Sequence, residues 1–134
     1  MELARRQTRR LRCTIPGGDR APAAARTILD CFDPTLEGRR REDARLLLSE
    51  VVTNSVRHAG AGPGQTVELM LSRSQRRLRV TVADHGGGFD HAAPRQPPDG
   101  DREGGRGLVL LDMIADRWGV DNGRVTRVWF ELTT

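Results

Sequence analysis

Two polar side chains on one predicted helix have the types and the spacing to act on a common ligand. Glu50 and Asn54 lie four residues apart in LLLSEVVTNSVRHA (46–59), so a helix places them one turn apart, about 40° from each other in projection. An Asn carbonyl oxygen suits a hard cation such as Mg²⁺, which keeps most of its waters. A Glu can orient or deprotonate a hydroxyl group or a water. For this helix alone, the plainer interpretation is a solvated Glu followed by an Asn that ends the helix.

A glycine-rich stretch after a predicted strand adds a third polar group. In VADHGGGFD (82–90) the strand ends at Asp84, and Gly86 to Gly88 follow at once. A carboxylate at a strand end can accept a hydrogen bond from an exocyclic amine such as that of adenine. Glycines beside it let the backbone approach a flat ligand closely. The alternative is a glycine turn after an edge strand, but three consecutive glycines are more than a turn requires.

A second glycine-rich stretch, GGRGL (104–108), is predicted to open a helix. Free backbone N–H groups at a helix N-terminus, with glycines that permit close approach, form an anion site suited to phosphates. Arg106 could reach a phosphate there, although such an arginine more often points to water. The chain contains no Lys, which excludes the phosphate loop of the GxxxxGK[ST] type, and no GxGxxG follows the first strand.

The periodicity of the chain predicts the elements that must position these groups. The expected order is a strand at 9–15, helices at 21–32 and 41–59, a hairpin of strands at 66–74 and 76–84, a loop at 85–107, a helix at 108–118, and strands at 118–122 and 124–132. Asp19 is the expected cap of the first helix, with Pro22 in its first turn. The expected apolar stripe of the long helix consists of Ala44, Leu48, Val51, Val52, Ser55 and Ala59. This order predicts a two-layer α+β sandwich.

Composition limits the classes of protein. The 134 residues suit one domain, and residues 1–8 are candidates for disorder. Acidic residues nearly balance the arginines, and aromatic residues make up 4% of the chain, which disfavours nucleic-acid binding. Cys13 and Cys31 lack CxxC spacing and are expected to be reduced thiols. No stretch is typical of a signal peptide or a membrane span, so we expect a cytoplasmic protein without a membrane partner.

Taken together, the three motifs resemble the N, G1 and G2 boxes of the GHKL ATPase superfamily. The matching residues are Glu50 with Asn54, Asp84 with Gly86 and Gly88, and Gly105 with Gly107 and Leu108. Within that superfamily, LLLSEVVTNSVRHA and the ending ADRWGV…VWFEL resemble the stand-alone anti-sigma-factor serine/threonine-protein kinases of actinobacteria. The resemblance implies one ATP-binding Bergerat fold over residues 1–134. In that fold a mixed, mostly antiparallel sheet is covered on one face by helices.

The resemblance also implies a role for each matching residue. Asn54 would help to hold Mg²⁺, Glu50 would act as general base, Asp84 would read adenine, and the turn from Gly105 to Gly107, with Arg106 within it, would wrap the phosphates of ATP. Residues 89–105 would form a mobile ATP lid.

The last strand resembles that of the family less closely. Thr126 matches the threonine that supports the adenine contact through water, but Val125 replaces the glycine that usually precedes it.

The expected function is therefore an ATP-binding anti-sigma factor with serine-protein kinase activity. It would sequester a sigma factor and phosphorylate an anti-sigma-factor antagonist protein on serine, using Mg-ATP. Kinases of this family are often homodimers, and this remains open here. One alternative is an ATP-binding interaction module without kinase activity, which the presence of Glu50 disfavours. Another is the catalytic domain of a histidine kinase, disfavoured because the chain shows no pair of phosphoacceptor helices.

Overall fold

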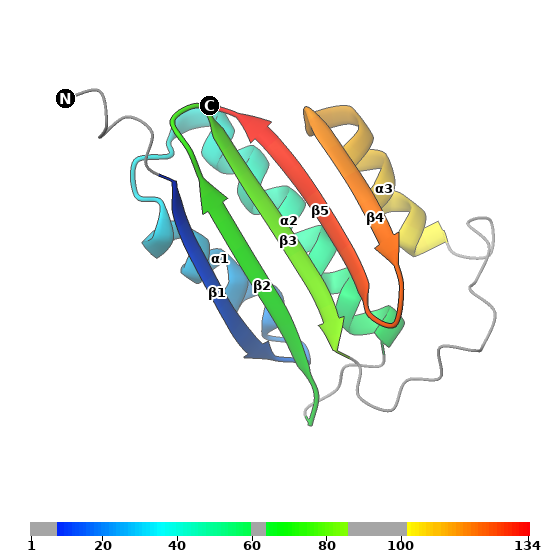
Figure 1. Ribbon diagram of the computed structural model, residues 1–134. Coiled ribbons are helices and arrows are strands. Elements are labelled where there is room, and N and C mark those ends of the chain that lie inside the picture. The colour runs from blue at the N-terminus through cyan, green and yellow to red at the C-terminus, as the bar shows by residue number, and fades with distance from the viewer. Residues whose placement is uncertain (1–7, 60–63, 86–101) are drawn as a thin grey trace.

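The computed structural model describes residues 8–59, 64–85 and 102–134, with the backbone alone described at 58, 59, 85 and 102–107. Its elements are β1 (Arg9–Pro16), α1 (Ala21–Phe32), α2 (Gly38–Ala59), β2 (Thr66–Arg73), β3 (Arg77–His85), α3 (Arg102–Ile114), β4 (Arg117–Asn122) and β5 (Thr126–Thr133). The strands form one sheet in the order β1-β2-β3-β5-β4. The three helices cover one face of this sheet (Figure 1). The predicted two-layer α+β sandwich is confirmed.

Two of the strand pairings, β2 with β3 and β4 with β5, join consecutive strands through short connections, whereas helices separate β1 from β2 and β3 from β5 along the chain. Each of the four pairings in the described part of the chain is antiparallel, where the resemblance predicts a mixed, mostly antiparallel sheet. The predicted hairpin of β2 and β3 is present, and its strands end within one residue of the expected positions.

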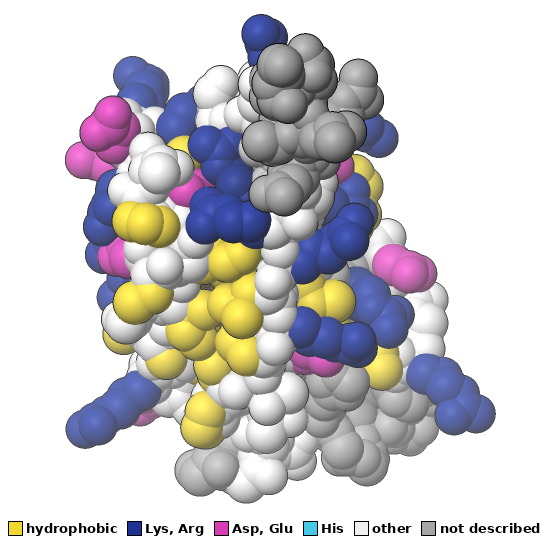
Figure 2. All heavy atoms as spheres, turned by 60° about the vertical axis from the view of Figure 1, so that its left-hand side comes forward, with side chains coloured by type: hydrophobic (Ala, Val, Ile, Leu, Met, Phe, Trp, Pro, Cys, Tyr) yellow, Lys and Arg dark blue, Asp and Glu magenta, His cyan; other side chains and the backbone are white. Residues whose placement is uncertain are grey.

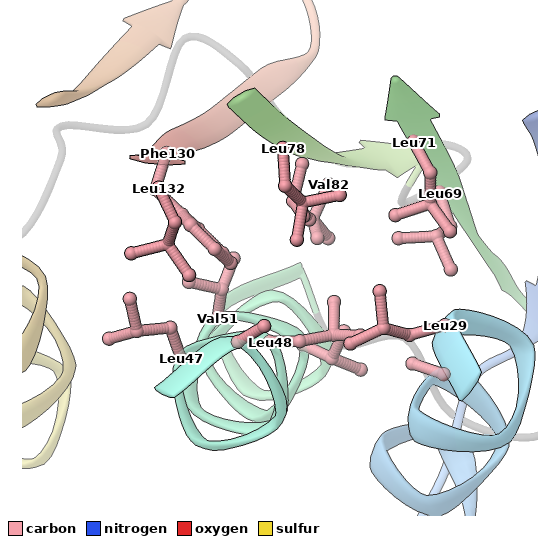
Figure 3. Close-up of a cluster of buried hydrophobic side chains, with 14 of the residues drawn as sticks. Leu29, Leu47, Leu48, Val51, Leu69, Leu71, Leu78, Val82, Phe130 and Leu132 are labelled. Carbon is pink, nitrogen blue, oxygen red and sulfur yellow. The ribbon is translucent and has the colours of Figure 1, made fainter. Parts of the chain in front are cut away.

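The core lies between the sheet and α2, and it follows from the alternation of side chains along each strand. Residues of β2 and β3 at alternate positions, such as Leu69, Leu71 and Val82, point toward the helices and are buried. Leucines and valines of α2 meet them from the other layer (Figure 3).

Five members of the predicted stripe on α2 are buried: Ala44, Leu48, Val51, Val52 and Ser55. The side chain of Ala59, the sixth, lies outside the described residues. Leu47 is also buried, although the predicted stripe omits it.

Two helix starts differ from the prediction for reasons visible in the backbone. The first N–H of α1 bonds the carbonyl of Gly18 at 3.2 Å, and the cap position is Arg20 without a side-chain bond, so the capping role expected of Asp19 is wrong. Pro22 lies in the first turn of α1, as predicted. Helix α2 begins at Gly38 rather than Arg41, because the N–H of Arg41 already bonds the carbonyl of Glu37.

The third helix begins six residues earlier than predicted and ends four residues earlier. It spans Arg102–Ile114, so the stretch GGRGL lies within its first two turns instead of opening it. It stops before β4 because the N–H of Asp116 bonds the carbonyl of Glu131 on β5. Most of the predicted loop, including Gly86, Gly88 and lid residues 89–101, lies outside the described residues, as does the N-terminal segment 1–7.

Among the described residues, none of the helices combines the length and the apolar character that crossing a membrane requires.

Candidate functional site

Helices α2 and α3 lie side by side and run in opposite directions (Figure 1). An ion pair fixes one end of this arrangement: Nη2 of Arg40, near the start of α2, lies 3.6 Å from Oδ2 of Asp116, just after α3. Buried Leu47 and Leu111 belong to the same two helices and to the common core. The C-terminal half of α2 therefore lies beside the N-terminal half of α3.

Glu50 and Asn54 lie on the flank of α2 that faces α3. Positions 40, 47 and 54 are seven residues apart, and a helix turns only about 20° from one such position to the next. Asn54 thus shares its flank with Arg40 and Leu47, and Glu50 lies about 40° away from Asn54. Glu50 lies ten residues, about 15 Å, along α2 from Arg40. Because α3 runs in the opposite direction, the part of α3 at the same height lies about ten residues before Asp116. This part is the GGRGL stretch (104–108).

Both side chains are half-buried, yet neither is used by the fold that surrounds it. Within the part of the chain that the structure describes, Glu50 and Asn54 make no side-chain hydrogen bond or ion pair. A carboxylate that has lost part of its water without gaining a partner is unfavourable for stability. The pair is therefore a candidate for contact with a ligand.

Asp84 is the last residue but one of β3, and β3 ends at the same end of the molecule as α2 (Figure 1). It is 7% exposed and pairs in register with Val67 of β2. Ala83 pairs with Arg127 of β5, and one further step along this register brings Asp84 opposite Thr126. The two adenine-site candidates, far apart in sequence, thus lie on adjacent strands. The Thr126 hydroxyl also lies 3.5 Å from the side-chain oxygen of Asn122 on β4.

The other predicted residues divide into three groups. Gly86 and Gly88 lie outside the described residues. Gly105 and Gly107, with Arg106 between them, have helical backbone in α3, and the Arg106 side chain is not described. Leu108 is half-buried and packs against the hydrophobic core, which is a sufficient reason for an apolar residue at this position.

Sequence reasoning missed the contacts that hold α3 beside α2 and the sheet. Besides the ion pair of Arg40 with Asp116, the indole N–H of Trp118 on β4 donates to Oδ1 of Asp112 on α3 over 3.2 Å. Arg40 and Asp116 are far apart in the chain, so no spacing motif could indicate that they meet. These contacts hold the C-terminal end of α3, and the antiparallel packing of α2 and α3 places the first turns of α3 near the level of Glu50 and Asn54.

The assembled groups have the chemistry of a nucleotide site. Asp84 can accept a hydrogen bond from a purine amine, and the backbone N–H groups in the first turns of α3 favour phosphates. Asn54 offers an oxygen to a hard cation, and Glu50 offers a base. Acceptor, anion site and base are thus supplied by three separate elements at one end of the molecule.

Comparison with known families agrees with this chemistry. The histidine kinase-like ATPase domain family matches residues 19–131, and the chain belongs to this family. Membership of an ATPase domain family implies that the chain binds ATP.

Among individual proteins, the chain is similar to serine-protein kinase RsbW from Staphylococcus aureus strain bovine RF122 / ET3-1 and from strain JH9. Each is 30% identical over 86 residues, which cover 56% of this chain and 54% of the relative. The similarity thus extends over about half the length of each relative.

Proposed function

We propose that this chain is an ATP-binding anti-sigma factor with serine-protein kinase activity. It sequesters a sigma factor and uses Mg-ATP to phosphorylate an anti-sigma-factor antagonist on serine. The observation that carries this proposal is the pair of half-buried side chains, Glu50 and Asn54, that make no hydrogen bond or ion pair within the described residues and face the first turns of α3. The name of the similar staphylococcal proteins, serine-protein kinase, supports serine as the acceptor.

Each site residue has one task in this proposal. The Asp84 carboxylate accepts the adenine amine, and Thr126 on the neighbouring strand supports that contact through water. Gly105, Arg106 and Gly107 place backbone N–H groups and a guanidinium near the phosphates. Asn54 contributes an oxygen to Mg²⁺, which neutralises phosphate charge when bound.

Glu50 acts on the protein substrate. The serine oxygen of the antagonist attacks the γ-phosphorus, the bond to the β,γ-bridging oxygen breaks, and ADP leaves with that oxygen. The serine hydroxyl proton passes to Glu50. Because phosphoryl transfer needs mainly positioning and charge neutralisation, one base and one binding site suffice in a chain of this size.

The partners follow from the motif resemblance and set the compartment. Sigma factors and their antagonists work where transcription takes place, so we place the protein in the cytoplasm. The proposal includes no membrane partner and no direct contact with nucleic acid.

The experiment is incubation of the protein with Mg-ATP and each antagonist candidate encoded in the same genome, with phosphoserine formation as the readout. One antagonist should gain phosphoserine, and its serine-to-alanine variant should not. Binding of sigma-factor candidates is measured in parallel by calorimetry. If ATP and a partner bind but no candidate gains phosphate, the chain is an ATP-binding interaction module without kinase activity.

A further inference from the structure

The sheet face that the helices leave uncovered carries an ordered grid of side chains. Register places outward-pointing residues of β1, β2 and β3 in rows across the sheet. One row consists of Arg10, Ser72 and Arg79, and the next of Arg12, Met70 and Thr81. These six residues, which we call the arginine hollow, line a depression of about 520 Å³. In the first row the short side chain of Ser72 lies between the long side chains of Arg10 and Arg79.

The arginine hollow has more positive than negative charge. Nε of Arg12 lies 2.6 Å from Oε2 of Glu68, and Nη1 of Arg79 lies 2.7 Å from Oε2 of Glu131. Arg10 is exposed and makes no ion pair within the described residues. Three guanidinium groups thus face two carboxylates, and one guanidinium is available for a carboxylate from another molecule.

The hollow borders β1, which is an edge strand of the described sheet. Edge strands present backbone N–H and C=O groups that can pair with an added strand. On the side of β1 that faces α1, Leu11 and Cys13 are only partly buried, as are Ile28 and Phe32 of α1, and all four pack against the common core. Figure 2 shows hydrophobic side chains gathered on this side of the molecule, with arginines next to them. Burial and the charge of Glu68 raise the pKa of the Cys13 thiol, so it is neutral and apolar at neutral pH.

We propose that β1 and the arginine hollow bind an extended segment of a protein partner in which acidic and apolar side chains alternate. The segment adds to the sheet beside β1 through backbone hydrogen bonds. Because successive side chains of a strand point to opposite faces, its acidic side chains lie on the face of the available guanidinium of Arg10, and its apolar side chains meet Leu11 and Cys13. This inference is independent of the nucleotide site, which lies on the helix-covered face.

Two other occupants fit the surface less well. A second copy of β1 carries three arginines and no acidic residue, so it offers no carboxylate to Arg10. Single-stranded nucleic acid needs an accessible aromatic ring, but the Arg79 guanidinium lies 4.1 Å from the centre of the Trp129 ring, and that ring lies directly against Gly119. An acidic protein segment meets neither obstacle.

The test uses the full chain and two libraries of labelled ten-residue peptides. In one library Glu or Asp alternates with randomised Val, Ile, Leu or Phe; in the other the same residues form an acidic block and an apolar block. We expect the alternating library to be retained about tenfold more strongly, because only alternation places all the acids on one face. Amide hydrogen exchange at β1 should slow when a selected peptide is bound. Equal retention of both libraries, or unchanged exchange at β1, would overturn the proposal.

Matched charge reversals locate the surface. Arg10→Glu should weaken a selected peptide about tenfold, whereas Arg76→Glu, an equal change at an exposed turn position, should alter affinity by less than about twofold. Equal losses in both variants would indicate general attraction to a basic protein and contradict a site. Binding of a labelled single-stranded DNA 12-mer that Arg10→Glu abolishes would assign the face to nucleic acid instead. A dimer in sedimentation that Arg10→Glu alters would assign it to a second copy.

Discussion

The two halves of α2 differ in how their polar side chains are used. In the first half, Asp30 of α1 pairs with Arg41, at 3.1 Å between Nη2 and Oδ1, and with Arg45. At the middle of the helix, Nη1 of Arg26 donates to the Ser49 hydroxyl over 2.7 Å. These groups hold α1 against α2, and each of them has an ion-pair or hydrogen-bond partner within the chain.

In the second half, Glu50 and Asn54 are about as buried as those groups but have no such contacts within the described residues. The difference is one of neighbours: the first half faces the polar surface of α1, and the flank with Glu50 and Asn54 faces the start of α3. Partnered polar groups explain stability, and half-buried groups without partners indicate a ligand. The comparison therefore predicts that changes in the second half alter function and changes in the first half alter stability.

The largest effect is expected from Glu50→Gln. Removing the base should slow phosphoserine formation about 10²–10⁴-fold, while Mg-ATP affinity and sigma-factor binding stay unchanged, because Glu50 acts on the serine hydroxyl. Transfer rate and calorimetric affinity are measured on the same preparation. Glu42→Gln, an equal change at an exposed position of α2, is the control. Transfer at the wild-type rate would remove the catalytic role and favour the module without kinase activity.

A smaller effect, on binding, is expected from Asp84→Asn. The amide presents an N–H₂ group where the carboxylate accepts from adenine, and losing a charge-assisted hydrogen bond in a closed site costs about 1.5–3 kcal/mol, roughly ten- to a hundredfold in ATP affinity. Thermal unfolding without nucleotide checks that the fold is intact, and Asp121→Asn at an exposed position of β4 is the control. Unchanged ATP affinity in calorimetry would show that the adenine assignment is wrong.

Asn54→Ala should show whether Asn54 contributes to binding of the metal or of the nucleotide. Loss of the amide oxygen should weaken Mg-ATP about tenfold and lower transfer as a consequence, because this oxygen would be one of the groups that hold Mg²⁺. Affinity for ATP in the presence of EDTA should not change. Equal losses with and without Mg²⁺ would mean that Asn54 contacts the nucleotide itself.

The sequence predicted the fold because the signals that define it are local. Alternation along β2 and β3 and the apolar stripe of α2 depend on residues a few positions apart, and Asp84 lies at a strand end for the same reason. The failures have physical causes too. The first N–H of α1 donates to the carbonyl of Gly18 and not to the side chain of Asp19, which was expected to cap the helix. The local sequence pattern does not show which of these two acceptors the N–H chooses.

What the sequence could not predict is the arrangement that gives the site its form. Arg40 meets Asp116, and Thr126 lies beside Asp84, only because the sheet and helices pack as they do. Periodicity placed Glu50 and Asn54 one turn apart. It could not show that they face α3, or that neither side chain has a hydrogen-bond or ion-pair partner among the described residues.

The smallest functional effect is expected from Asp30→Asn, which tests the other half of the comparison. Asp30 is partly exposed and its arginine partners are too, so solvent screens both pairs and their loss should lower the free energy of unfolding by about 1 kcal/mol or less. Denaturant unfolding measures this change. ATP affinity and transfer rate should equal those of the unmodified protein, because the lost contacts only join α1 to α2. A fall in ATP affinity would show that the two halves of α2 act together, and the division between a structural half and a ligand-binding half would then be wrong.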